Sequence, residues 1–386
     1  MESYEFICPC HFGLEAVLKK EITELGYSIT SVEDGKVSFS GDVNAFARAN
    51  IFLRTAERVL LKVGSFRAES FEDLFQGTKS IPWEQYLPED AKFWVAKANS
   101  VKSKVFSPSD IQSVMKKAMV ERMKEHYHTT WFNETGASFP VRVSILKDIV
   151  TVGLDTSGES LHKRGYRKMI AKAPIEETLA AALIMLTPWN RDRILVDPFC
   201  GSGTIPIEAA MIGLNIAPGM NREFLAESWT GLIPKKSWYA AVEEANSKII
   251  TDCELNIQGY DLDNEVIKAA RQNAEDAGVL EHIHFQQRDV ADLRNPKKYG
   301  FIITNPPYGE RLEDLKTLPA LYKTIGESFK GLDSWSMFLI TSYEDALQSL
   351  GLTPDKNRKI YNGMIKTYFY SFMGPKPPKR NRQNPE

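Results

Sequence analysis

The sequence of 386 residues predicts an α/β protein in which a parallel, doubly wound sheet follows a smaller α+β module. Three observations lead to this fold class. From residue 174 onward, short apolar runs alternate with segments of helical spacing, as in parallel strands joined by helices. Asn362-Gly363 separates the last two apolar runs and indicates an antiparallel hairpin at the sheet edge. Before residue 168, a long helix is followed directly by two strands, which favours an α+β arrangement.

Residues 1–60 are predicted to form a small α/β unit. Asp34-Gly35 indicates a hairpin turn between two strands, and Asp42 is expected to cap the helix that follows them. The expected elements, in order, are a strand at 6–8, a helix at 12–25, strands at 29–32 and 37–39, and a helix through 46–49.

Residues 61–167 are predicted to form the α+β module, and they include a basic block. Residues 91–172 carry 15 Lys and Arg against 7 Asp and Glu, a net charge of +8, whereas the whole chain has −2. Such a block indicates a polyanionic partner, although a solvated lysine-rich helix gives the same count. The expected elements are a strand at 93–96, a long helix from 107 to 123, and strands at 140–145 and 149–154.

The remainder of the chain is predicted to form the doubly wound sheet. An insertion at 218–252, with a helix at 238–250, has a role that the sequence leaves open. Residues 375–386 are Pro-rich and basic and are expected to form a flexible tail that touches nucleic acid. The expected helices are at 175–186, 204–212, 264–277 and 318–329, and the strands at 194–196, 255–260, 283–287, 301–304, 337–341, 359–361 and 365–372.

Composition narrows the class of protein. With 43% apolar and 25% charged residues, the chain is typical of globular proteins. Four cysteines are too few for a disulfide scaffold, and they favour the cytoplasm. We expect neither a secretory signal nor a membrane span, because no apolar run is long enough. Cys8-Pro9-Cys10-His11 lacks a second pair at ligand spacing, so no metal site is expected.

A glycine-containing turn, Asp-Pro-Phe-Cys-Gly-Ser-Gly-Thr at 197–204, follows the strand at 194–196. Gly201 and Gly203 allow the backbone to approach a ligand, and the helix that starts at Thr204 offers free N–H groups. The charge of Asp197 disfavours a pyrophosphate and favours an amine or a sulfonium. A dinucleotide fingerprint also needs a third glycine near Ile207, so a nicotinamide oxidoreductase is disfavoured.

Acidic side chains end the next two strands. Asp261 is placed to bind the two hydroxyls of a ribose, and Asp289 to accept the amino group of an adenine. Asp263 is expected to cap the following helix. Because ligands of open α/β sheets bind at the carboxyl ends of the strands, we expect Asp197, Asp261, Asp289 and Asn305 to line one edge.

Asn305-Pro306-Pro307-Tyr308 follows a buried strand and suits a planar base with an exocyclic amine. The Asn305 amide oxygen and the Pro306 carbonyl can each accept one amine N–H, while the Tyr308 ring stacks on the base. The prolines fix φ and remove two donors. The alternative is a proline turn after a strand. Glu310 and Arg311 are expected to form an ion pair on the same loop.

Together, the segment 197–208 and Asn305-Pro306-Pro307-Tyr308 resemble the class I S-adenosylmethionine-dependent amino-methyltransferases. The segment 155–167 makes the chain similar to the THUMP-containing RNA guanine-N2 methyltransferases. The nearest match is the N-terminal half of the bifunctional 23S rRNA methyltransferases of the RlmL type, which are often labelled N6-adenine-specific DNA methylases. The resemblance covers nearly the whole chain and departs at its C-terminus, where we expect no second catalytic half.

The resemblance implies a Rossmann-like methyltransferase sheet at 168–374, a ferredoxin-like unit at 1–60, a THUMP RNA-binding module at 61–167 and the tail at 375–386. It implies that Asn305, Pro306 and Tyr308 orient the target amine. Lys163, Arg164 and Arg167 are expected to contact RNA phosphates. S-adenosylmethionine would be held by Asp197, Cys200, Gly201, Gly203, Thr204, Asp261, Leu262, Asp289, Val290 and Asn305.

The function that follows is methyl transfer to an exocyclic amine of an RNA base, with N2 of guanine in 23S rRNA as the leading substrate. The motif is equally compatible with N6 of adenine in DNA or RNA, and with N2 of guanine in tRNA. A non-catalytic RNA-binding assembly factor is a further alternative, disfavoured by the intact acidic strand ends. The sequence leaves the oligomeric state open.

Overall fold

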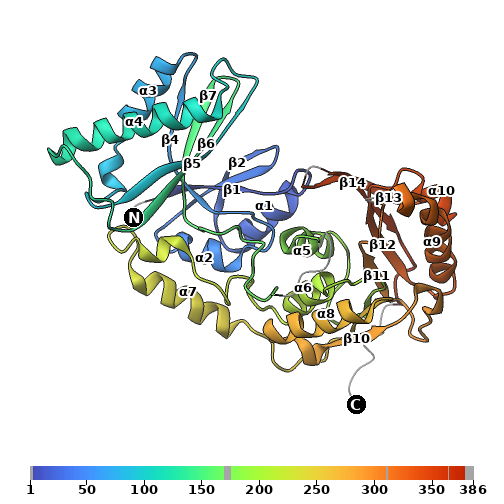
Figure 1. Cartoon of the computed structure of the whole chain (residues 1–386). Helices are drawn as coiled ribbons and strands as arrows, with labels where there is room; N and C mark the ends of the chain where they lie inside the picture. The colour runs from blue at the N-terminus through green and yellow to red at the C-terminus, as the bar shows by residue number, and fades with distance from the viewer. Residues whose placement is uncertain (1–2, 169–174, 310–311, 364, 379–386) are drawn as a thin grey trace. The chain divides into compact units, whose positions relative to one another are not determined.

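The computed structural model describes residues 3–168, 175–309, 312–363 and 365–378 (Figure 1). The chain forms two compact units. Unit 1 consists of Met1–Cys10, Leu18–Leu161 and Arg222–Ser247, and unit 2 of His11–Val17, His162–Asn221 and Lys248–Glu386. Each unit therefore contains a segment that lies, in sequence, within the other.

Unit 1 is built on one seven-stranded sheet of order β2-β3-β1-β4-β7-β6-β5. Neighbouring strands are antiparallel, apart from the parallel pair β5 and β6. The strands are β1 (Tyr4–Pro9), β2 (Ser28–Glu33), β3 (Lys36–Gly41), β4 (Leu60–Arg67), β5 (Lys92–Val101), β6 (Ser138–Leu146) and β7 (Ile149–Asp155).

Helices α3 (Phe71–Ser80) and α4 (Pro108–Tyr127) pack on each other and on strands β4 and β5. A capping box between Ser70 and Asp73 starts α3. The spacing of the buried residues of α4 puts them on one face of the helix. Burial of each large apolar side chain among them stabilises the fold by about 1.5–3 kcal/mol. These residues are Ile111, Met115, Ala118, Met119 and Met123.

Two expectations for unit 1 need correction. Asp42 does not cap α2 (Ala45–Phe52), because the N-cap is Asn44 and makes no side-chain capping bond. The Asp42 carboxylate, two residues before the N-cap, instead accepts the Asn44 backbone N–H at 3.1 Å. Strand β4 was not expected; Gly64 and two neighbouring polar residues obscure its pattern, yet it lies in the middle of the sheet.

The insertion contributes to unit 1. Its helix α7 (Lys235–Ser247) packs on α2, where Arg48 binds Glu244 through two N–H···O bonds of 2.7 and 2.9 Å. Trp229 stacks on Phe139 of β6 with ring centroids 4.5 Å apart. A bidentate ion pair and a buried aromatic pair thus hold residues 222–247 in this unit.

Unit 2 contains a second seven-stranded sheet, of order β10-β9-β8-β11-β12-β14-β13. Strands β10, β9, β8, β11 and β12 are parallel, β14 pairs antiparallel with β12, and β13 pairs antiparallel with β14, so the expected sheet and its edge hairpin are confirmed. The strands are β8 (Leu195–Asp197), β9 (Ile257–Asp261), β10 (Ile283–Gln287), β11 (Phe301–Thr304), β12 (Ser336–Thr341), β13 (Lys356–Asn362) and β14 (Ile365–Phe372).

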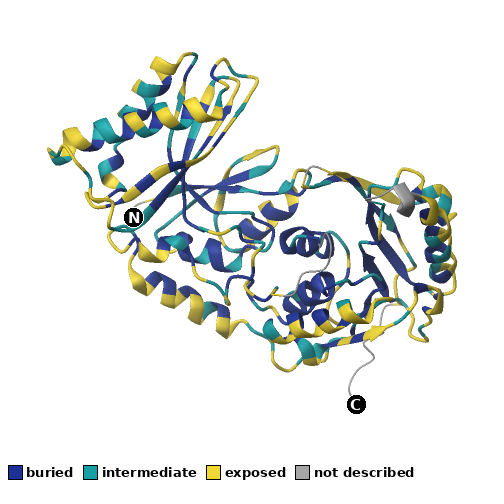
Figure 2. Cartoon of the chain, viewed as in Figure 1, coloured by how far each residue is buried: buried dark blue, intermediate teal, exposed yellow. Residues whose placement is uncertain are grey.

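The central strands of unit 2 are buried throughout, as Figure 2 shows in dark blue, because helices accompany the parallel strands. Helix α10 was not expected from the sequence. Residues 379–386 of the basic tail lie outside the described residues. The helices of the unit are α5 (Glu177–Met185), α6 (Thr204–Gly213), α8 (Asn264–Asp276), α9 (Leu312–Lys330) and α10 (Ala346–Leu350).

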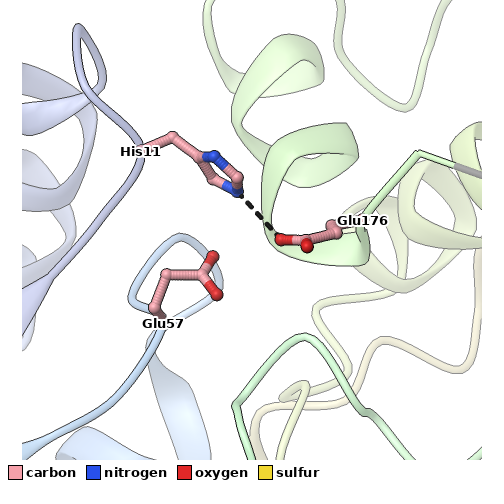
Figure 3. A group of neighbouring side chains, drawn as sticks. All are labelled: His11, Glu57 and Glu176. Atoms are coloured by element: carbon pink, nitrogen blue, oxygen red, sulfur yellow. Dashed lines mark ion pairs between the residues drawn. The ribbon is translucent and has the colours of Figure 1, made fainter. Parts of the chain in front are cut away.

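Residues 11–17 belong to unit 2 because their side chains contact it. The His11 Nε2 atom lies 3.2 Å from the Glu176 carboxylate (Figure 3), and its Nδ1 atom lies 3.1 Å from the Tyr361 carbonyl. Leu14 is fully buried in the core that contains Leu179 and Leu183. Among the described residues, no helix is both long and apolar enough to cross a bilayer.

Candidate active site

A cavity of about 690 Å³ opens at the carboxyl ends of strands β8, β9, β10 and β11 in unit 2. This is the edge at which open parallel sheets bind ligands. Eleven of the residues singled out in the sequence line it together: Asp197, Cys200, Gly201, Thr204, Asp261, Leu262, Asp289, Val290, Asn305, Pro306 and Tyr308.

The glycine turn has two glycines with different tasks. Gly201 has φ 51° and faces the cavity, and a Cβ atom there would meet nothing within 4 Å. Gly203 has φ 89° and does not line the cavity; its Cβ would lie 3.1 Å from Ala270 and 3.2 Å from Phe285. Gly201 therefore leaves room for a ligand, whereas Gly203 permits close packing behind the turn.

Asp197 is buried at the end of β8. Its Oδ1 atom accepts the Thr304 hydroxyl at 2.7 Å and the Phe199 backbone N–H at 3.1 Å. Burial raises the pKa of Asp197 to about 7, with a further contribution from the negative charge of Asp261. A cationic ligand in the cavity would favour the ionised form of this carboxyl group.

Asp261 joins two loops at the end of β9. Its Oδ2 atom accepts the Gly201 backbone N–H and its Oδ1 atom that of Asp263, both at 3.1 Å. Burial raises the pKa of this carboxyl group as well. The next residue, Leu262, is 59% exposed and lines the cavity with an apolar side chain. Asp263 caps α8, as expected, by accepting the Glu265 N–H at 2.8 Å.

After β10, Asp289 is exposed at the rim of the cavity, and its Oδ1 atom accepts the Ala291 backbone N–H at 2.8 Å. Val290 is buried beside it, and its carbonyl accepts the Ser328 hydroxyl at 2.8 Å. The hydrogen bond of Oδ1 to the following short turn thus fixes the position of Asp289, and Oδ2 takes no part in that bond.

Asn305 follows β11 with its Oδ1 atom buried and without a hydrogen-bond partner among the described residues. An unpaired buried acceptor costs about 1–3 kcal/mol, so its retention in a cavity indicates a ligand donor. The Pro306 and Tyr308 side chains line the same wall. This is the arrangement that recognition of an exocyclic amine requires.

The Asn-Pro-Pro-Tyr loop is held by residues that the sequence did not reveal. The Tyr322 hydroxyl of α9 donates to the Pro307 carbonyl at 3.2 Å and hydrogen bonds with the Thr341 hydroxyl at 2.6 Å. Asn362 Nδ2 of the edge hairpin donates to the Tyr308 hydroxyl at 3.2 Å. Contacts over such sequence separations leave no local signal.

The linker cations do not lie as expected. Arg164 is buried against fully buried Glu208, with Nε 3.4 Å from Oε1, so phosphate contact by Arg164 is contradicted: the ion pair hides its guanidinium. Tyr166 also donates to Glu208, at 3.0 Å. Lys163 is exposed, and its phosphate contact stays a prediction.

Arg167 is directed toward the cavity turn. Its guanidinium lies 3.0 Å from Glu177 Oε1 and donates to the Thr204 hydroxyl at 2.7 Å. It thereby ties the linker to the first residue of α6. Glu310 and Arg311, expected to pair on the catalytic loop, lie outside the described residues.

The cavity has two chemically distinct sides. Carboxylates from β8, β9 and β10 offer anionic acceptors suited to a ribose, an amine or a sulfonium. The loop after β11 offers an amide oxygen, a proline carbonyl and an aromatic ring. A volume of about 690 Å³ lies within the range of small-molecule sites and admits a nucleoside cofactor. The unpaired Asn305 oxygen and the open space at Gly201 fit S-adenosylmethionine with an amine acceptor beside it.

Three family models match successive parts of the chain. Residues 5–60 match the RlmL ferredoxin-like domain, and residues 68–155 match the THUMP domain. Residues 164–370 match the RMKL-like methyltransferase domain.

Two relatives cover most of the chain. The protein named "Putative RNA methyltransferase YpsC" of Bacillus subtilis (strain 168) is 46% identical over 384 residues, which are 99% of both chains. The ribosomal RNA large subunit methyltransferase K/L of Shewanella pealeana is 34% identical over 369 residues. That match covers 92% of this chain but 51% of the relative, so the chain spans about half the length of such relatives.

Solved structures share the whole architecture. A "possible methylase" from Clostridium difficile 630 is 50% identical, with a TM-score of 0.95 over 98% of this chain and 100% of that one. SMU.472, a "putative methyltransferase complexed with SAH", is 41% identical, with a TM-score of 0.92 over 98% of this chain and 100% of that one.

Proposed function

The chain belongs to the RMKL-like methyltransferase family and is an S-adenosylmethionine-dependent RNA methyltransferase, and from this premise we propose that it methylates N2 of a guanine in 23S rRNA. The observation that carries the proposal is the buried Asn305 Oδ1 atom without a partner in the described chain, beside Pro306 and Tyr308. The K/L relatives, whose names specify large-subunit rRNA, support the choice of substrate.

We assign the acidic side of the cavity to the cofactor. Asp261 would bind the ribose hydroxyls and Asp289 the adenine amino group, while Leu262 and Val290 would contact the adenine ring. Asp197 would face the cationic part of the cofactor, Gly201 would leave room for it, and Thr204 would offer its backbone N–H at the start of α6. Cys200 would supply packing only, and Gly203 would support the turn from behind.

S-adenosylmethionine supplies, when bound, a methyl group on a positively charged sulfur. The Asn305 amide oxygen and the Pro306 carbonyl would accept the two N–H bonds of the target amine, which turns the nitrogen lone pair toward the methyl group. The Tyr308 ring would stack on the base. Positioning of this kind is the main contribution needed, because the amine needs little acid–base help before attack. A base in a paired or stacked region would be extruded to reach the site.

The proposed domains are a ferredoxin-like unit at 1–60, the THUMP module at 61–167, the methyltransferase domain at 168–374 and a tail at 375–386, with action in the cytoplasm. Of the linker cations, Lys163 remains as the proposed phosphate contact, because its side chain is exposed whereas Arg164 is buried and Arg167 is directed toward Thr204. The ordering of the three family matches along the chain supports this arrangement.

The test is methylation in vitro followed by mass spectrometry of nucleosides. The full chain, with S-adenosylmethionine, is given large-subunit rRNA, small-subunit rRNA and tRNA from cells lacking the gene, and duplex DNA. N2-methylguanosine formed in large-subunit rRNA by the wild type, but not by Asn305→Ala, supports the proposal. N2-methylguanosine in tRNA alone, or N6-methyladenine in DNA, replaces it with the corresponding alternative.

A further inference from the structure

Four strands of unit 1, in the order β4-β7-β6-β5, have one covered and one open face. Helices α3 and α4 cover the face that carries Phe93 and Val95, and the Lys116 ammonium of α4 lies 3.7 Å from the centre of the Phe93 ring. Side chains alternate along a strand, so the residues between these point to the other face. No helix among the described residues packs on the outer part of that face, where Trp94 and Asn99 are exposed.

The open face is rich in cations. The strand registers place five of them there: Lys62, Arg67, Lys92, Lys97 and Arg142. Lys97 lies opposite Arg142, and Arg142 opposite Gly153, which in turn faces Lys62. Three of the four strands therefore contribute a positive side chain to one row across the sheet, and β7 contributes Gly153.

Acidic residues pair with three of these five cations and leave Lys92 and Lys97. Asp155 is the one acid at an open-face position of these four described strands, and it is buried, where Arg58 and Arg142 each bind it at 2.7 Å. Lys62 and Arg67 pair with acids outside these strands. Lys92 and Lys97 are exposed and form no ion pair within the described chain.

Apolar side chains share the same face. Trp94 is 38% exposed, two positions after Lys92 on the same face and just before the bulge between Val95 and Lys97. At the far end Val101, Leu146 and Ile149 lie directly opposite one another and are 41–54% exposed. Two exposed lysines beside an exposed tryptophan and an apolar row indicate a ligand with both phosphates and exposed base faces.

We propose that this open face binds a single-stranded segment of the RNA substrate. The lysines neutralise phosphates, and Trp94 and the apolar row contact unstacked bases, which a paired helix does not expose. The inference rests on the proposed function for its substrate class, and it adds the surface and the strandedness of the RNA that the surface holds.

The test uses fluorescence anisotropy with the full chain and a fluorescein-labelled, mixed-sequence 16-nucleotide RNA, single-stranded or annealed to its complement. Trp94→Ala is expected to weaken single-strand binding by about tenfold. The double variant Lys92→Ala, Lys97→Ala is expected to reduce the slope of log affinity against log salt by about 1.4, or about 0.7 for each lost phosphate contact. Circular dichroism checks that each variant keeps its fold.

Matched controls remove the same groups elsewhere in the module. Trp131 is 77% exposed after α4, and Lys117 and Lys124 are exposed on α4 itself. Trp131→Ala, and Lys117→Ala with Lys124→Ala, are expected to leave binding unchanged. The proposal is overturned if both sets of variants behave alike, if the duplex binds as tightly as the single strand, or if Trp94→Ala alters only self-association in sedimentation.

The two levels of inference fail separately. If the chain methylates 23S rRNA and the Lys92, Lys97 and Trp94 variants keep the wild-type KM for that RNA, the open face is wrong while the function stands. If these variants lose single-strand binding but the wild type methylates no rRNA, the surface stands and the proposed substrate is wrong.

Discussion

The two sides of the cavity differ in how far the protein itself satisfies their polar atoms. Asp197, Asp261 and Asp289 each accept at least one backbone N–H, from their own turn or, for Asp261, also from the glycine turn. The Asn305 amide oxygen accepts none among the described residues, although it is buried. The acidic side is therefore assembled before a ligand arrives, whereas the amide side keeps an unsatisfied acceptor, which we propose that the substrate amine satisfies. Loss of a side chain should accordingly affect binding on one side and the rate on the other.

The largest effect is expected for Asn305→Ala. Because its amide oxygen has no other partner, its contribution lies mainly in the transition state, and kcat should fall by about 100-fold or more. Cofactor affinity, measured by calorimetry, should change by less than about threefold in the same variant. An equal loss of both quantities would mean that the two sides are not separate.

Asp261→Ala should act on the other side. The variant loses charge-assisted bonds to the ribose and the anchor of Gly201, so S-adenosylmethionine binding should weaken by about 1–3 kcal/mol. Calorimetry measures the change, with Asp263→Ala as the control, since that residue caps α8 instead. Unchanged affinity in a folded Asp261 variant would remove it from the site.

Cofactor binding should also depend on pH through Asp197. Its pKa is raised to about 7, so lowering the pH from 7.5 to 6 protonates it, removes a negative charge, and weakens binding of the cationic cofactor by up to about tenfold. Stability should move in the opposite direction: a raised folded pKa favours the protonated native state, so this contribution to stability falls as pH rises from about 4 to 7. Calorimetry and thermal unfolding of Asp197→Asn, in which both dependences should flatten, provide the check.

A smaller effect is expected for Tyr322→Phe, which removes one hydroxyl from behind the Asn-Pro-Pro-Tyr loop. The Pro307 carbonyl loses its hydrogen-bond donor, so the loop is held less firmly. Transition-state stabilisation should fall by about 1 kcal/mol, which lowers kcat by about fivefold. Steady-state kinetics should show cofactor affinity unchanged. Tyr343→Phe, which contacts the Tyr322 ring but not the loop, serves as the matched control.

The sequence predicts the residues that line the cavity more completely than the residues that support them. Asp197, Asp261 and Asn305 could be found because the first two end short strands, the third directly follows one, and parallel strand ends meet at one edge of the sheet. Tyr322, Thr341 and Asn362 could not, because each reaches the loop from an element without a local motif. Arg164 shows a different limit: a charge count cannot reveal that Glu208 of α6, 44 residues later in the sequence, neutralises it in the interior.

The exchange of short segments between the two units has a consequence for dissecting the enzyme. Residues 11–17 bring Leu14 into the core of unit 2, and residues 222–247 bring Trp229 and Glu244 into unit 1. A fragment that begins near residue 168 would lack the first segment and leave the aromatic side chains of the second exposed to water. No single cut in the chain releases either half intact. Gene fusions, truncations and split reporters built on one boundary will therefore report on damaged folds, and independent function of the parts is better tested by point substitutions in the intact chain.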